Sequence, residues 1–269
     1  MAPRAPKIVD LRYRSAQRCL IFAIGDVHGE LALLQAAADA IRRYNTRHLK
    51  HVVMLGDYVD RGPNSRGVVD YLERRSARPI TCLRGNHEQI MLNALTARDS
   101  STLERWMDLG GAATLKSYGA EQLDLDALAS VPDAHVAWMD QLPHAALDEH
   151  RIYVHAGVAP DVALEDQTEQ TLLWIRERFL KVDRPQRFPL GKHVVHGHTP
   201  VWRSKPDAAL PELLEHRTNL DTGAYGTGLL SVGVFDAARP GGPVDLLSIP
   251  RASLPRASLQ EPFRYAKAG

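Results

Sequence analysis

The stretch Ile21-Phe22-Ala23-Ile24-Gly25-Asp26-Val27-His28-Gly29-Glu30 decides how this chain is organised. Its first four residues are apolar, which predicts a buried β-strand. Glycines bracket Asp26 and His28, so the backbone can bend sharply and present both side chains at the end of the strand. A carboxylate oxygen and an imidazole nitrogen together suit a divalent transition metal. Taken alone, the stretch is equally compatible with an ordinary turn between a strand and a helix.

The same plan recurs twice further along the chain. His51–Leu55 is a predicted strand that leads into Gly56-Asp57-Tyr58-Val59-Asp60-Arg61-Gly62. Pro79–Leu83 is the next predicted strand, and it leads into Arg84-Gly85-Asn86-His87-Glu88. Helices are predicted between these strands, over Leu31–Ile41 and Ser65–Arg75. This alternation predicts a largely parallel sheet, with the polar turns gathered at the carboxyl ends of its strands.

Two more strands end in histidines. Arg151–Val154 is followed by His155-Ala156-Gly157, and Lys192–Val195 is followed by His196-Gly197-His198-Thr199-Pro200. The segment between them, Thr168–Phe179, is predicted as one helix because its apolar residues have helical spacing. A glycine-rich loop, 219–228, then precedes a predicted β-hairpin formed by residues 229–235 and 244–249, with glycines in its turn.

The rest of the chain carries no comparable motif. Residues 89–148 are predicted to form short helices, which we interpret as a helical cap beside the strand ends. Trp106, Trp138 and Met139 within that cap are interpreted as packing residues. We divide the chain into an arm (1–18), a catalytic domain (19–249) and a tail (250–269). The tail repeats Arg-Ala-Ser-Leu, which we interpret as a solvated surface segment, with a regulatory segment as the alternative.

Composition narrows the class of protein. The chain has 269 residues, with 33 Lys and Arg against 32 Asp and Glu, so its net charge is +1. This balance argues against nucleic-acid or membrane binding by bulk charge. Cys19 and Cys82 both lie beside apolar runs, so we expect two buried thiols and a reducing compartment. The first residues lack the apolar core of a signal peptide, and we therefore expect a cytoplasmic protein.

The strand-end side chains form a set of metal ligands. The set consists of Asp26, His28, Asp57, Asn86, His155 and either His196 or His198. It is too large for a single zinc ion, and a structural zinc site would favour cysteines. Two ions about 4 Å apart that share one carboxylate fit it better, because such a pair can clamp the attacking and leaving oxygens of a phosphoryl transfer.

Arginines at or near the same turns suit a phosphate ligand. Arg61 and Arg84 lie within a few residues of the predicted metal ligands, and a guanidinium can bind phosphate oxygens bidentately. Arg176 is a third candidate, although Arg178 competes with it for the same role. Each arginine could instead form an ordinary surface ion pair.

The motifs resemble a known family. Gly25-Asp-Val-His-Gly29, Gly56-Asp-Tyr-Val-Asp-Arg-Gly62 and Gly85-Asn-His-Glu88 resemble the signature motifs of the phosphoprotein phosphatase family of metallophosphoesterases. His155-Ala-Gly157 and Gly197-His-Thr-Pro200 follow in the family's order. The resemblance implies a four-layer α/β/β/α sandwich of the calcineurin-like type, with a dinuclear site between two mixed sheets. This differs from the single, mostly parallel sheet that the alternation of elements predicts.

The resemblance also implies how the metals are held. Asp26, His28 and Asp57 would bind one ion, and the ligands of the other, which shares Asp57, would be Asp57, Asn86, His155 and His198. His196 stays outside this set. Manganese is the expected metal, with iron, zinc and cobalt as alternatives. Pro200, where broader metallophosphoesterases carry a further histidine, favours the phosphoprotein phosphatase branch, and the loop 221–225 resembles its bacterial and phage members.

The implied activity is hydrolysis of phosphoserine and phosphothreonine in proteins, with phosphotyrosine left open. The resemblance implies that a hydroxide bridging the two metals attacks phosphorus. We expect His87 to act as general acid and Asp60 to orient its ring, because a carboxylate partner favours the protonated imidazole. Dinucleoside tetraphosphate hydrolases share every metal motif and are the main alternative. A non-catalytic scaffold is the remote alternative, and such a scaffold would be expected to have lost ligands.

Overall fold

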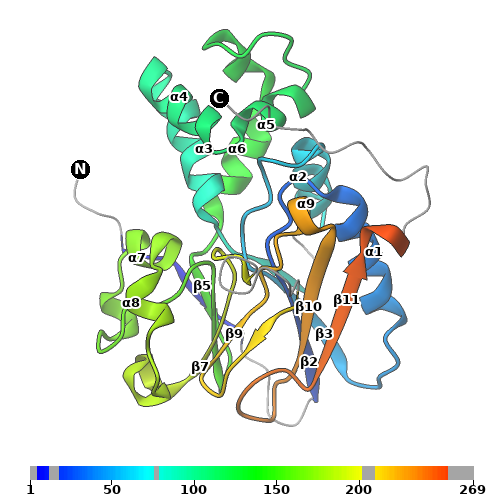
Figure 1. The fold of residues 1–269 in the computed structure, drawn as a ribbon, viewed down its shortest axis with the longest axis vertical. Helices are drawn as coiled ribbons and strands as arrows, with labels where there is room; N and C mark the ends of the chain where they lie inside the picture. The colour runs from blue at the N-terminus through cyan, green and yellow to red at the C-terminus, as the bar shows by residue number, and fades with distance from the viewer. Residues whose placement is uncertain (1–4, 12–17, 76–78, 202–209, 254–269) are drawn as a thin grey trace.

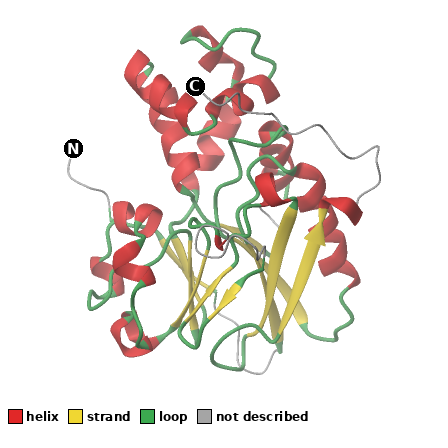
Figure 2. Cartoon of the chain, viewed as in Figure 1, coloured by secondary structure: helices red, strands yellow, loops and turns green. Residues whose placement is uncertain are grey.

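The structure is a computed structural model, and it describes residues 5–11, 18–75, 79–201 and 210–253. Two mixed β-sheets pack face to face with helices on their outer sides (Figures 1 and 2). The fold is therefore the four-layer α/β/β/α arrangement that the family resemblance implies. The single, mostly parallel sheet predicted from the alternation of elements is wrong, because the later strands build a second sheet.

The first sheet has six strands, with both parallel and antiparallel pairs. In spatial order they are β1 (Ile8–Asp10), β5 (Ala145–Leu147), β6 (Arg151–Val154), β7 (His193–His196), β9 (Arg217–Asn219) and β8 (Glu212–Leu213). The edge strand β1 comes from the expected N-terminal arm, which therefore contributes to the sheet. The strands β5, β8 and β9 are not predicted from the sequence, because segments of two or three residues show too little alternation to detect.

The second sheet has five strands. In spatial order they are β11 (Asp245–Pro250), β10 (Leu229–Asp236), β2 (Cys19–Ile24), β3 (Leu49–Met54) and β4 (Ile80–Cys82). The pairs β2–β3 and β3–β4 are parallel, as the βα repeat predicts, and β10 joins β2 antiparallel. The predicted hairpin of β10 and β11 is confirmed.

The helices α1 to α8 fall into three groups. The second sheet is covered by α1 (Leu31–Arg43) and α2 (Ser65–Glu73), and the first by α7 (Glu169–Trp174) and α8 (Glu177–Leu180) (Figure 1). The cap above the sheets consists of α3 (Asn86–Ala97), α4 (Ser100–Asp108), α5 (Gly111–Ser117) and α6 (Asp133–Gln141) (Figure 1). Shorter helical segments are α9 (Ala224–Thr227) and the 3₁₀ turns Asp126–Ser130, Leu164–Asp166, Pro185–Arg187, Pro189–Gly191 and Arg251–Ser253.

Alternation along β2 shows why the layers form. Phe22 and Ile24 belong to the apolar cluster on the helix side, whereas Ile21 and Ala23 belong to the cluster between the two sheets. Successive strand residues point to opposite faces, so a continuous apolar strand must be covered on both sides. Cys19 and Cys82 are buried free thiols, as predicted. No helix within the described residues has the length and apolar composition needed to cross a membrane.

Two helical predictions need correction. The predicted helix Thr168–Phe179 is two helices, α7 and α8, because the chain turns at Arg176, whose φ is −131° and ψ is −99°. The segment Asn86-His87-Glu88, predicted as a turn before a helix, is the first turn of α3 itself. Both differences matter for the site, since they decide where Arg176, Asn86 and His87 point.

A fully buried arginine ties the second sheet to the first. Arg151 on β6 donates from Nε to the Gly241 carbonyl at 2.9 Å and from NH2 to the Arg239 carbonyl at 2.5 Å, in the connection between β10 and β11. NH1 reaches the Asp236 carbonyl at 3.2 Å and the Asp148 carboxylate at 3.3 Å. The guanidinium therefore satisfies two carbonyls of the connection, the carbonyl of Asp236 at the end of β10 and one buried carboxylate at once.

We expect Arg151→Met to destabilise the fold by roughly 3–5 kcal/mol, because it leaves the Asp148 carboxylate buried without its cation. Chemical denaturation measures this as a lower midpoint with an unchanged slope. Arg187→Met is the matched control, since Arg187 pairs with Asp161 at the surface and should change stability little. Equal midpoints for the two variants would contradict the role assigned to Arg151.

Candidate metal centre

The predicted metal ligands converge between the two sheets, below the cap. Asp26 and His28 follow β2, Asp57 follows β3 and Asn86 opens α3, all from the second sheet's side. His155 follows β6 and His198 follows β7, from the first sheet. Every one of these residues is at most 5% exposed. Buried polar groups of this kind need partners, so their convergence defines one site.

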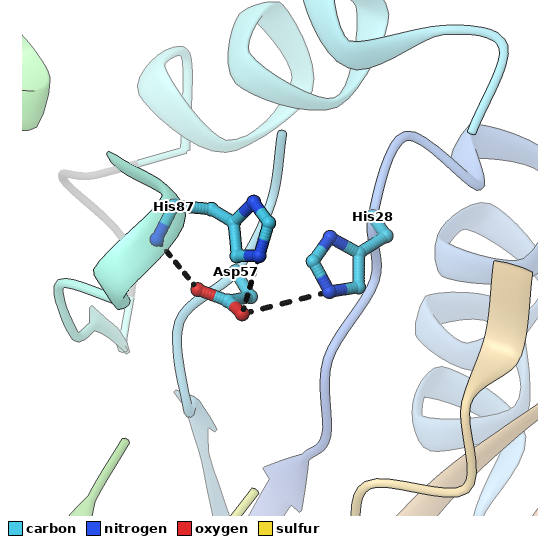
Figure 3. A group of neighbouring side chains, drawn as sticks. All are labelled: His28, Asp57 and His87. Atoms are coloured by element: carbon cyan, nitrogen blue, oxygen red, sulfur yellow. Dashed lines mark hydrogen bonds and ion pairs between the residues drawn. The ribbon is translucent and has the colours of Figure 1, made fainter. Parts of the chain in front are cut away.

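Asp57 lies in the middle of the cluster. Its Oδ2 is 3.5 Å from His28 Nε2, and its Oδ1 is 3.3 Å from His155 Nε2. Figure 3 shows one oxygen of the Asp57 carboxylate joined by dashed lines to the rings of both His28 and His87. Two buried groups able to hold an ion share it: one with His28 and His87, the other with His155 and His198, each with ligand atoms within 4.8 Å. One carboxylate therefore faces two possible ion positions.

Asn86 completes the side nearer the first sheet. Its Oδ1 is 2.8 Å from His155 Nε2 and 2.8 Å from His198 Nδ1. His198 Nε2 is buried without a hydrogen-bond partner among the described residues. Asn86, His155 and His198 thus bring their ligand atoms close together, and one ring nitrogen of His198 is left without a hydrogen bond in the described part of the chain. A bound ion would account for both features.

Asp26 reaches the cluster from the other side. Its two carboxylate oxygens accept from the backbone N–H of His198 at 3.2 and 3.1 Å. Asp26 belongs to neither of the two groups whose ligand atoms all lie within 4.8 Å of one another, and His87 takes its expected place beside His28 and Asp57. The predicted ligand is thus present and buried, but it faces the His198 segment.

Glycines make room for these carboxylates. A Cβ on Gly85 would lie 2.2 Å from Asp57 Oδ1, and one on Gly197 would lie 2.1 Å from Asp26 Oδ1. Real Cβ contacts are never this short. Only a residue without a side chain leaves room for the carboxylate at each of these positions. Gly85 accommodates Asp57, and Gly197 accommodates Asp26.

Unusual backbone conformations gather at the same place. Five of the eight non-glycine residues with positive φ among the described residues lie at this site. They are His28 (43°), Asp57 (52°), Asp60 (71°), Arg61 (69°) and His198 (67°). Left-handed conformations cost free energy for side-chain-bearing residues, and they persist where the surroundings fix them, typically at functional sites.

The protonation states suit metal binding. Burial lowers the pKa of His28, His155 and His198, which favours neutral imidazoles with a lone pair to offer. Burial also raises the pKa of Asp26, with further contributions from Asp221 and Asp57, and raises the pKa of Asp221 to about 6. Crowded buried carboxylates are unfavourable without a cation, so the residues present fit divalent ions.

His87 and Asp60 form a buried pair beside the cluster, referred to below as the His87–Asp60 pair. His87 Nδ1 lies 2.7 Å from Asp60 Oδ2, and both side chains are almost fully buried. Burial alone would lower the pKa of His87, but the carboxylates of Asp57 and Asp60 outweigh it, so the pKa lies above its ordinary value. This ring is therefore biased towards the protonated form, unlike the three histidines above.

The predicted phosphate-binding arginines differ in position. Arg61 reaches the centre, since its guanidinium nitrogens lie 2.7 Å from His28 Nε2 and 2.9 Å from His87 Nε2. Arg84 donates to Gln89 at 2.8 Å and pairs with Asp140 on α6, while its buried Nε has no partner among the described residues. Its guanidinium is thus held by the cap.

Arg176 and Arg178 differ in what they contact. Arg176 donates to Thr199 Oγ1 at 2.9 Å and lies 3.4 Å from the His198 carbonyl, next to a predicted metal ligand. Arg178 is exposed on α8, where its charge acts on Asp161. The break between α7 and α8 is what turns Arg176 towards the site.

Four residues at the site were missed as site residues or only partly recognised. Glu88 accepts from four backbone N–H groups: Asp57 and Gly85 at 2.9 Å, Tyr58 at 2.7 Å and Val59 at 3.2 Å. The sequence did offer a signal for Glu88, because it stands three residues after Gly85, the spacing of a helix capping box.

Asp221 lies beside Asp26. Tyr225 has its ring 5.4 Å from that of His28. Trp174 has its ring 6.1 Å from that of His198, and the helix predicted there concealed it.

His196 and His135 both lie outside the centre. His196 stays out of the ligand set, as expected: its Nε2 is 3.4 Å from Arg217, and burial lowers its pKa to about 3. His135 on α6 lies 3.4 Å from Asp70 and 3.7 Å from Glu73 on α2. Because Asp70 is also near Arg66 and Arg74, we interpret the group around His135 as an ion-pair network at the base of the cap.

Comparison with known proteins agrees with this geometry. The calcineurin-like phosphoesterase family matches residues 20–226. Serine/threonine-protein phosphatase 1 of Salmonella typhimurium is 28% identical over 79% of this chain and 90% of its own length. The symmetrical bis(5'-nucleosyl)-tetraphosphatase of Paracidovorax citrulli is 32% identical over 55% of this chain and 49% of its own. A solved structure provisionally assigned as a diadenosine tetraphosphatase superposes with a TM-score of 0.60 at 22% identity, covering 91% of this chain and 98% of its own. The match spans every strand-end motif described above, and the chain belongs to the calcineurin-like phosphoesterase family.

Proposed function

We propose that this phosphoesterase is a phosphomonoester hydrolase that removes phosphate from phosphoserine and phosphothreonine in proteins. The observation that carries the proposal is the buried His87–Asp60 pair, with 2.7 Å between its atoms, beside the ligand cluster. Serine and threonine leave as alkoxides, which are very poor leaving groups and need a proton. In this proposal His87 donates that proton to the leaving oxygen, and Asp60 orients its ring. The extended similarity to a bacterial serine/threonine phosphatase supports the same substrate class.

The proposed metal ligands are those that the family resemblance implies, and Asp26 is the one carboxylate among them that belongs to neither ligand group. We assign His28, Asp57 and Asp26 to one ion and Asp57, Asn86, His155 and His198 to the other, with Asp57 shared. Two bound divalent ions, with manganese expected, would supply Lewis-acid stabilisation of the phosphoryl oxygens and activation of water. The protein's own part is to hold neutral imidazoles and carboxylates in place and to keep His87 protonated.

Arginines would bind the phosphate. Arg61 lies between His28 and His87, so a phosphate oxygen placed there would meet both its guanidinium and the proton donor. Arg176 approaches from the opposite side, beside His198. Arg84, whose buried Nε is free of hydrogen bonds within the described residues, is the third candidate. Guanidinium groups on two sides would neutralise charge on the transferring phosphoryl group.

A dinucleoside tetraphosphate hydrolase is the second candidate, and one observation favours it. Two partly exposed aromatic rings flank the cluster: Tyr225 beside His28, with Arg61 4.9 Å from its centroid, and Trp174 beside His198. Aromatic and guanidinium surfaces stack well on nucleobases. The anhydride leaving group of that substrate, however, needs much less help from a proton donor.

A direct competition of substrates tests the proposed function. With manganese present, we expect phosphoserine and phosphothreonine peptides to have a higher kcat/KM than diadenosine tetraphosphate, because the His87–Asp60 pair would compensate for their poor alkoxide leaving groups and gives the anhydride little further advantage. Phosphate release and nucleotide chromatography measure the two reactions on the same preparation. The reverse order would move the assignment to the tetraphosphate hydrolases.

The shared carboxylate makes a second prediction. Asp57→Asn should lower bound metal and activity together, because a neutral amide cannot serve two cations as a carboxylate does. Elemental analysis after manganese loading measures the stoichiometry. Asp70→Asn is the control, since Asp70 lies in the α2–α6 ion-pair network and should leave the metal content unchanged. Two ions retained per chain in Asp57→Asn would remove Asp57 from the bridging role.

The pair Arg176 and Arg178 gives a matched test of phosphate binding. Arg176→Ala should lower kcat/KM and raise the inhibition constant for inorganic phosphate, by roughly 10- to 100-fold for a lost charge-assisted contact. Arg178→Ala, two residues away and exposed, should change neither. Arg61→Ala and Arg84→Ala are expected to behave like Arg176→Ala, with metal content intact. An unchanged phosphate inhibition constant in any variant would count against that arginine.

A further inference from the structure

The second oxygen of Asp60 is held by the helical cap. Asp60 Oδ1 accepts from Trp106 Nε1 at 2.9 Å and from Thr114 Oγ1 at 2.7 Å. The Thr114 hydroxyl also accepts from the Asp60 backbone N–H at 2.8 Å, as Ser65 Oγ does at 3.0 Å. Asp60, Trp106 and Thr114 are all fully buried. The carboxylate is therefore saturated on one side by two neutral donors.

These contacts come from a different part of the fold than Asp60. Asp60 lies in the loop after β3, whereas Trp106 is on α4 and Thr114 on α5. Between those helices, the Gly110 carbonyl accepts from the Arg61 backbone N–H at 3.2 Å. Asp60 and Arg61 both have left-handed φ angles, of 71° and 69°, so the cap contacts a strained segment at several points.

We propose that Trp106 and Thr114 are positioning residues, which fix the Asp60 carboxylate so that its Oδ2 remains aimed at His87. Buried carboxylate oxygens take the partners available to them. With Oδ1 occupied by Trp106 and Thr114, only Oδ2 is left for the His87 ring. The inference rests on the proposed function of His87 as proton donor, and it extends the catalytic apparatus into the cap.

Trp106 therefore has two roles in one side chain. It belongs to the apolar core, as the interpretation of a packing residue expects. Its indole N–H donates a hydrogen bond to the Asp60 carboxylate, because burying that N–H without a partner would be destabilising. Trp138 on α6 offers a comparison, since it is a cap tryptophan that packs against Tyr58, with ring centroids 5.9 Å apart.

The test compares variants that differ by one hydroxyl. Thr114→Val keeps the shape of the side chain and removes the hydrogen bond, whereas Thr114→Ser keeps the hydroxyl. We expect Thr114→Val to lower kcat for a phosphoserine peptide by roughly 10- to 100-fold, with KM nearly unchanged. It should slow p-nitrophenyl phosphate much less, because that leaving group needs little protonation. Thr114→Ser should restore most of the loss.

The tryptophans give the second, independent variant. Trp106→Phe should show the same bias between the two substrates, and Trp138→Phe should show none. Unfolding midpoints and metal content, measured on each variant, separate a loss of packing from a loss of positioning. A similar fall for both substrates in Thr114→Val and in Trp106→Phe would make the two residues merely structural and would overturn the inference.

A double-mutant cycle closes the test. A residue that acts only through His87 should have no further effect once His87 is gone, so Thr114→Val should change kcat little in a His87→Asn background. If the two effects instead multiply, the inference is wrong. His87→Asn alone should slow the peptide by roughly 10²- to 10⁴-fold and bias the two substrates in the same direction. If His87→Asn shows no bias, the proton-donor role itself fails; if only the Thr114 and Trp106 variants show none, the positioning inference fails alone.

Discussion

The Glu88 carboxylate is the interaction on which the site depends. By accepting from the backbone N–H groups of Asp57, Tyr58, Val59 and Gly85, it binds the loop after β3 to the first turn of α3. That loop cannot satisfy its own N–H groups while Asp57 is left-handed, so a buried acceptor with two oxygens supplies what the backbone lacks. Asp57, Asn86 and His87 owe their relative positions to this one side chain.

A second constraint is the uneven distribution of charge. The first sheet contributes two neutral imidazoles, His155 and His198, and the second contributes the carboxylates Asp26 and Asp57. Asp221, in the loop that leads to β10, adds a further buried acid beside Asp26. Carboxylates packed this closely repel one another, and only a cation or a proton relieves that repulsion. Bound cations would therefore join the two sheets, because they would be held by imidazoles from the first sheet and by carboxylates from the second.

The sequence predicts the parts of this site that are local. Asp26, Asp57 and Asn86 each follow an apolar strand and a glycine. A few neighbouring residues are therefore enough to predict which ligand atom each offers and that it lies at the end of a strand. The contacts of Trp106 and Thr114 with Asp60 could not be predicted, because they join segments 46 and 54 residues apart that carry no shared pattern. The break before α8 was likewise hidden, since the apolar spacing continues across Arg176. The ligands next to each strand can be predicted from the sequence, whereas the hydrogen bonds that distant helices make to Asp60 cannot.

Gly85 and Gly197 also limit how this protein can evolve. Neither makes a polar contact with substrate or metal through a side chain, yet any Cβ at these positions would occupy the space of a carboxylate oxygen. A substitution there would displace Asp57 or Asp26 while every chemically active residue remained in the sequence. At these two places the smallest side chain is therefore as restricted as the carboxylates it accommodates.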